Sequence, residues 1–128
     1  MEENTFPAYN TLKMDERKWE QLFEKADQVV KRTAQSMPPE LRAEAEKVPC
    51  LFEKWPPEGE EVLGQCLSFE EHVVSEAPGP IVLYLGTIHE VCEEFDLDYA
   101  DEVRITFLHE LGHHLGLDER DLEERGLL

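Results

Sequence analysis

Basic side chains are scarce in this 128-residue sequence, which has 12 Lys and Arg against 30 Asp and Glu and a formal net charge of −18. Proteins that bind nucleic acid or anionic membranes neutralise phosphates with a basic surface, so the composition argues against both classes. The deficit is concentrated in residues 55–128, whose net charge is −16, whereas residues 1–54 carry −2. Such a field attracts cations and basic peptides, although high acidity also serves solubility alone.

Paired cysteines and long apolar runs are also missing. The three cysteines, Cys50, Cys66 and Cys92, have no CxxC spacing, which argues against a disulfide framework and a zinc knuckle. We expect reduced, mostly buried thiols in a cytoplasmic protein, because the N-terminus lacks the features of a secretion signal. The longest clearly apolar run, at 81–85, has five residues, far fewer than the roughly 20 that a membrane helix needs.

The chain is long enough for one domain with one core, and its composition is 41% hydrophobic. Residues 1–14 are expected to be flexible or loosely docked on that domain. Apolar periodicity and turn residues predict helices at 15–36, 39–47, 87–95, 99–115 and 119–125, and strands at 48–55, 62–69 and 81–85. This order predicts an α+β fold with a small sheet packed against helices.

The most informative segment is residues 109–113, His-Glu-Leu-Gly-His, an HExxH motif in the helix expected at 99–115. Residues four apart lie about 40° apart around an α-helix, so His109 and His113 share one face and can bind one metal ion. Zn²⁺ is the default ion for nitrogen ligands. Glu110 lies on the flank of this face, where its carboxylate can take a proton from a metal-activated water as a general base.

The other residues of the same helix indicate that the two histidines have a functional role and do not fill the core. Its apolar stripe lies nearly opposite them and consists of Phe107, Leu108, Leu111 and Leu115. Histidines that merely filled the core would lie within that stripe. Glu102 and Thr106 lie on the histidine side and are expected to support the ligands, whereas His114 is expected to face solvent or to support them.

A catalytic zinc needs a third protein ligand. Gly116 can end the helix and turn the chain back, and the spacing HExxHxxGxx then places an acid at Glu119. Asp118 beside it is the rival ligand. A purely structural role also fits, because Asp118 and Asp121 suit the N-terminus of a last helix and Glu119 suits its first turn. The residues leave three alternatives open: Glu119, Asp118 or neither.

Residues 103–119, Val-Arg-Ile-Thr-Phe-Leu-His-Glu-Leu-Gly-His-His-Leu-Gly-Leu-Asp-Glu, resemble the minimal zincins, small bacterial zincin-like metallopeptidases described as matrix-metalloprotease-like. Weaker similarity extends upstream through 36–41, 62–65 and 80–84. The resemblance implies a single small zincin-like domain with its active-site helix near the C-terminus, and hydrolysis of peptide bonds with zinc. It also implies that His109, His113 and Glu119 bind the metal and that Glu110 is the base.

The sequence departs from the metzincins proper, which use a third histidine and a downstream Met-turn. Position 119 is Glu, and Met1, Met14 and Met37 all lie upstream of the motif. A carboxylate ligand neutralises more of the zinc charge than imidazole does, which makes the bound water less acidic. The metal is therefore better supported than efficient proteolysis.

We predict a monomeric, cytoplasmic, zinc-dependent peptidase for short or exposed peptides, with basic ones favoured. A peptide is expected to add to an edge strand beside the site helix. The main alternative is a non-catalytic zinc-binding interaction module that retains the zincin fold, and the presence of Glu110 favours the enzyme. An acidic helical adaptor without metal is a further alternative.

Overall fold

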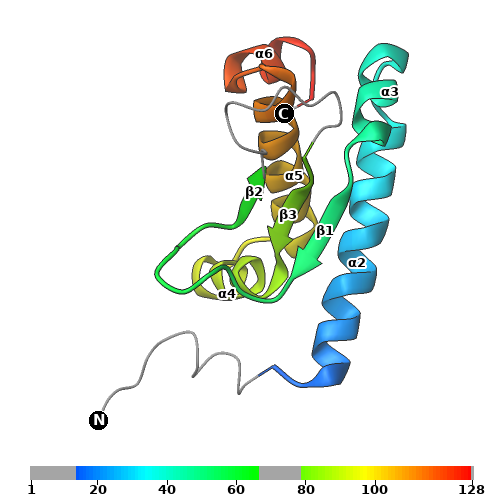
Figure 1. Cartoon of the computed structure of the whole chain (residues 1–128). Coiled ribbons are helices and arrows are strands. Elements are labelled where there is room, and N and C mark those ends of the chain that lie inside the picture. The colour runs from blue at the N-terminus through cyan, green and yellow to red at the C-terminus, as the bar shows by residue number, and fades with distance from the viewer. Residues whose placement is uncertain (1–13, 67–78, 128) are drawn as a thin grey trace.

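The computed structural model describes residues 14–66 and 79–127, and these residues have an α+β architecture (Figure 1). The helices and the three-stranded sheet follow in the predicted order, which confirms the expected fold class. The elements are α2 (Glu16–Gln35), α3 (Pro39–Lys47), β1 (Cys50–Glu53), β2 (Gly64–Cys66), β3 (Ile81–Tyr84), α4 (Leu85–Phe95), α5 (Tyr99–Leu115) and α6 (Glu119–Glu124). Of residues 1–14, expected to be flexible or loosely docked, only Met14 is described, and it is partly buried against the core. The end of the strand expected at 62–69 lies outside the described residues.

The long helix α2 forms because its ends and its apolar spacing agree. The Asp15 side chain caps its N-terminus by accepting a hydrogen bond from the backbone N–H of Lys18 at 2.8 Å. Leu22, Ala26 and Val29 recur at three- and four-residue steps and are buried. This stripe packs α2 against α5 and α4, and α2 runs along the β1 side of the sheet in Figure 1.

The sheet has the order β1-β3-β2, with β3 in the centre. β1 pairs with β3 in parallel and β2 pairs with it antiparallel. All four residues of β3 are buried, as expected of a continuously apolar central strand. In the described part of the chain β2 is therefore one edge of the sheet, and it packs against α5.

The junction between β3 and α4 differs from the prediction. Leu85, expected as the last strand residue, is the first residue of α4. The backbone N–H of Gly86 donates to the carbonyl of Lys54 at 2.9 Å, and a Cβ at Gly86 would lie 2.6 Å from that oxygen. Glycine thus permits a close approach of the loop after β1, and the chain turns directly from strand into helix.

The core brings α5 into contact with α2, α4, β2 and β3. Its largest fully buried side chains come from β3, α4 and α5, namely Ile81, Leu83, Leu85, Ile88, Val103, Phe107 and Leu108. Among the described helices, none is both long and apolar enough to cross a membrane. The C-terminal end of α5 emerges from this core beside β2 and leads into α6 (Figure 1).

Candidate metal centre

Helix α5 carries the HExxH motif in its last two turns, and its termini explain where it begins and ends. Asp98 caps the N-terminus by accepting a hydrogen bond from the backbone N–H of Asp101 at 2.9 Å. Gly116 ends the helix in the left-handed conformation, with φ of 74°, which glycine adopts without strain. The N–H of Leu117 then donates to the carbonyl of Gly112 at 2.7 Å. The chain is thereby turned back toward the histidine face before α6 begins.

The two motif histidines lie on the exposed side of α5, as the angular argument predicts. Their rings are 5.7 Å apart between centroids, with an interplanar angle of 86°. The side chains of His109 and His113 are 37% and 61% exposed, whereas Phe107, Leu108 and Leu111 are buried. Neither histidine is therefore needed to fill the core.

The two candidate third ligands have different environments. Asp118 caps α6: its side chain accepts the N–H of Asp121 at 2.8 Å, and the Asp121 carboxylate accepts the N–H of Asp118 at 3.0 Å. This reciprocal capping box occupies the Asp118 carboxylate. Glu119 projects from the first turn of α6, and its Oε2 lies 3.7 Å from Nε2 of His109. Of the two acids, Glu119 has the better position beside a motif histidine.

The three proposed ligands do not form a converged cluster. Within residues 14–66 and 79–127, no group of three or more His, Cys, Asp or Glu side chains is arranged to hold a metal ion. Nδ1 of His113 instead lies 3.6 Å from Oε1 of Glu110. The donor chemistry nevertheless fits zinc, which prefers imidazole nitrogen and carboxylate oxygen. The exposed side chains of His113 and Glu119 can change rotamer without disturbing the core.

Glu110 is the most enclosed polar side chain of the motif, with 14% of it exposed. Its carboxylate contributes to the raised pKa of Cys66, the last residue of β2. Burial is the larger cause of that rise, and Glu110 adds to it. The Cys66 thiol is therefore protonated near neutral pH and is a poor nucleophile.

Cys66 also contacts His114, with 3.9 Å between Sγ and Nδ1. His114 is half-buried and supports the junction between β2 and α5. This pair was not predicted from the sequence, in which its members are 48 residues apart. No local spacing signals it, since the contact depends on how an edge strand packs on a distant helix.

Glu102 and Thr106, expected to support the histidines, have other partners. Oγ1 of Thr106 donates to the backbone carbonyl of Glu102 at 2.7 Å. A Cβ at Gly64 would lie 3.0 Å from the Thr106 methyl group, so β2 and α5 approach closely at this point. Burial and then the carboxylate of Glu102 raise the pKa of Cys92 to about 11, which places that carboxylate near α4.

A small mixed sheet, an HExxH helix packed against its edge strand and a glycine turn leading to an acidic helix define an α+β protein of the zincin type. The chain belongs to the family of zincin-like metallopeptidases, whose sequence profile matches residues 24–127. The match extends from α2 to the end of α6 and confirms the resemblance found in the sequence. A comparison with curated proteins gives no match.

Proposed function

We propose that this chain is a zinc-dependent peptidase in which Glu110 is the general base. The observation that carries the proposal is the arrangement at the C-terminal end of α5. His109 and His113 share its exposed face, Glu119 lies 3.7 Å from His109, and the largely enclosed Glu110 lies beside His113. In a chain of the zincin-like metallopeptidase family, this arrangement supports hydrolysis better than it supports a structural role.

In this proposal His109, His113 and Glu119 hold the zinc ion. When bound, zinc polarises the peptide carbonyl and lowers the pKa of water. Glu110 accepts one proton from the water whose oxygen attacks the carbonyl carbon. It then delivers that proton to the nitrogen of the leaving amine as the C–N bond breaks. Because Glu110 is largely enclosed, its carboxylate is held in one place for both transfers.

The position of β2 favours a peptide over a small molecule as the substrate. β2 is an edge of the sheet in the described residues, and an extended peptide can pair with the free edge of a strand. Cys66, the last residue of β2, contacts His114 on the site helix. A peptide that pairs with β2 therefore runs beside the C-terminal half of α5, where the motif lies.

We further propose a monomer that acts on short or exposed peptides in the cytoplasm, with basic peptides favoured and with no nucleic-acid or membrane partner. The net charge of −16 in residues 55–128 supports the preference for basic peptides. The three cysteines are free thiols, Cys92 buried and Cys50 and Cys66 half-buried, and free thiols are compatible with a reducing compartment. Burial, with a smaller contribution from Asp27, raises the pKa of Cys50 to about 12.

The peptidase activity is tested with the purified full-length protein and a mixed peptide library that includes basic sequences. We expect cleavage, detected by mass spectrometry, that a chelator abolishes and added Zn²⁺ restores. An inactive library assay with zinc bound to the protein would instead support the non-catalytic zinc-binding module.

The third ligand is tested by comparing Glu119→Gln with Asp118→Asn. Glu119→Gln is expected to weaken zinc affinity by about 10-fold or more, because an amide is a poorer ligand than a carboxylate. Asp118→Asn is expected to affect mainly the cap of α6, with a loss of about 1 kcal/mol at most in the free energy of unfolding. Competition with a zinc-sensitive dye and urea denaturation measure the two effects. Zinc loss in the Asp118 variant alone would move the ligand by one residue.

A further inference from the structure

A large groove lies between α4, the connection from β1 to β2 and the start of α2. Its volume is about 1060 Å³, slightly above the usual size of ligand sites, roughly 300–1,000 Å³. Half-buried apolar side chains line it, namely Met14, Trp55, Pro56, Leu63 and Val91. None of the proposed zinc ligands belongs to this lining.

The groove is strongly acidic. Five glutamates line it, and Lys18 is the single Lys or Arg among its lining residues. Burial, followed by the charge of Lys18, lowers the pKa of His89 in the same lining, so this histidine adds no positive charge near neutral pH. Glu93 and Glu94 near the end of α4 are exposed and available to a ligand. An apolar surface bordered by carboxylates is complementary to a peptide that carries both aliphatic and cationic groups.

The strand β2 connects this groove with the candidate metal centre. Leu63 lines the groove, β2 begins at the next residue, and its last residue Cys66 contacts His114 of α5. The strand rises about 3.3 Å per residue, so Leu63 in the groove and Cys66 beside α5 are about 10 Å apart along it. Gln65 in the middle of β2 donates to Glu60 of the groove at 2.6 Å and accepts from the Tyr84 hydroxyl at 2.8 Å. β2 thus runs from the groove to the C-terminal half of α5, the helix that carries the motif.

We propose that this groove binds a cationic and apolar segment of the substrate, about three or more residues from the scissile bond. This inference rests on the proposed peptidase function and names its substrate class. A peptide paired with the edge of β2 at Cys66 reaches the groove about three residues further along, beside Leu63. There the methylene groups of Lys or Arg pack on the apolar lining while their charged ends reach the glutamates.

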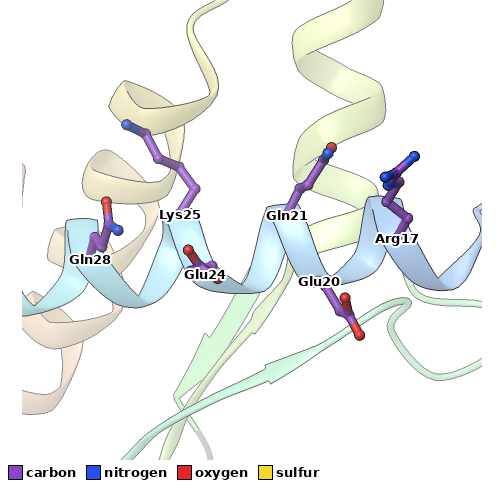
Figure 2. A pocket seen from close by; sticks show the side chains of 6 residues that line it. All are labelled: Arg17, Glu20, Gln21, Glu24, Lys25 and Gln28. Atoms are coloured by element: carbon purple, nitrogen blue, oxygen red, sulfur yellow. The ribbon is translucent and has the colours of Figure 1, made fainter.

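The exposed face of α2 provides a matched control surface. Six of its side chains, shown in Figure 2, point in different directions from a single helix and include two basic, two acidic and two neutral groups: Arg17, Lys25, Glu20, Glu24, Gln21 and Gln28. None of these residues lines the groove. Replacing Glu20 and Glu24 by lysine therefore changes the net charge of the protein as much as replacing Glu93 and Glu94 does, but at another place.

The test measures binding separately from cleavage. The full-length Glu110→Gln protein is titrated into a short fluorescent peptide that carries Lys-Leu pairs, and anisotropy gives the Kd at low salt. Glu93→Lys with Glu94→Lys is expected to raise this Kd by about 10-fold or more, whereas Glu20→Lys with Glu24→Lys is expected to change it less than about twofold. A peptide with Ser in place of each Lys is expected to bind the protein with unaltered Glu93 and Glu94 as weakly as the Lys peptide binds the Glu93/Glu94 double variant. Circular dichroism checks the fold of both double variants.

Three results would overturn the inference: an unchanged Kd in the Glu93/Glu94 variant, equal losses in both double variants, or equal affinity for the Lys and Ser peptides. It would also fail if a synthetic peptide of residues 1–13 bound the groove more tightly than the basic peptide, because the chain's own N-terminal segment would then be the occupant. Groove-dependent binding of the basic peptide without any cleavage by wild type would instead refute the peptidase function and leave the ligand class standing.

Discussion

Purified protein is expected to contain about one zinc ion per chain, and His113→Ala is expected to reduce this content to near zero. The replacement leaves one motif imidazole and one carboxylate, too few ligands for a stable protein zinc site. His113 is 61% exposed, so its truncation opens no cavity in the core and the fold should persist. Elemental analysis of protein purified without chelators measures the metal, and circular dichroism measures the fold.

His114→Ala is the matched control, because it removes the neighbouring imidazole from the same helix turn. His114 contacts Cys66 and is no proposed ligand, so this variant should retain its zinc. If wild type binds no divalent ion even after reconstitution with Zn²⁺, the proposed metal centre is wrong. If both variants lose zinc equally, the loss reflects a disturbed helix end and says nothing about ligation by His113.

The helices could be predicted from the sequence because their determinants are local. The limits of α3 and α5 agree with the predicted ranges, and α5 is bounded by residues with a clear local role, Asp98 as its cap and Gly116 as its end. The same periodicity separates His109 and His113, with side chains 37% and 61% exposed, from the buried part of the apolar stripe, namely Phe107, Leu108 and Leu111. Helix limits and helix faces can be predicted because they depend on residues only a few positions apart in the sequence.

Features that depend on distant segments could not be predicted. The periodicity of residues 81–85 cannot show that Leu85 begins a helix, since this depends on the approach of Lys54 to Gly86. The contact of Cys66 with His114 likewise requires β2 to pack on α5. The acids after Gly116 stayed ambiguous because capping and metal binding both use a carboxylate, and only the structure shows that Asp118 caps α6.

The replacement Glu110→Gln separates an enzyme from a zinc-binding module. Glutamine keeps the size of the side chain and one oxygen acceptor, but it cannot take a proton from water. A group needed for folding or for holding the metal would affect stability or zinc content when changed, whereas a general base affects turnover. We expect this variant to keep its zinc and its fold and to lose peptidase activity by at least about 100-fold, the usual scale for a missing acid–base group.

The assay follows initial rates on a basic peptide at low salt, with zinc content determined on the same samples. Glu123→Gln removes an exposed carboxylate from α6, and we expect it to keep wild-type activity, so any loss specific to Glu110 is not an effect of net charge. An unchanged rate in the Glu110 variant would refute its role whatever the zinc content. A variant that loses zinc together with activity would instead mean that the contact between Glu110 and His113, at 3.6 Å, serves to position the ligand. Retained zinc with lost turnover is the one result that assigns the proton transfer to Glu110, because the metal and the fold are then the same in both proteins.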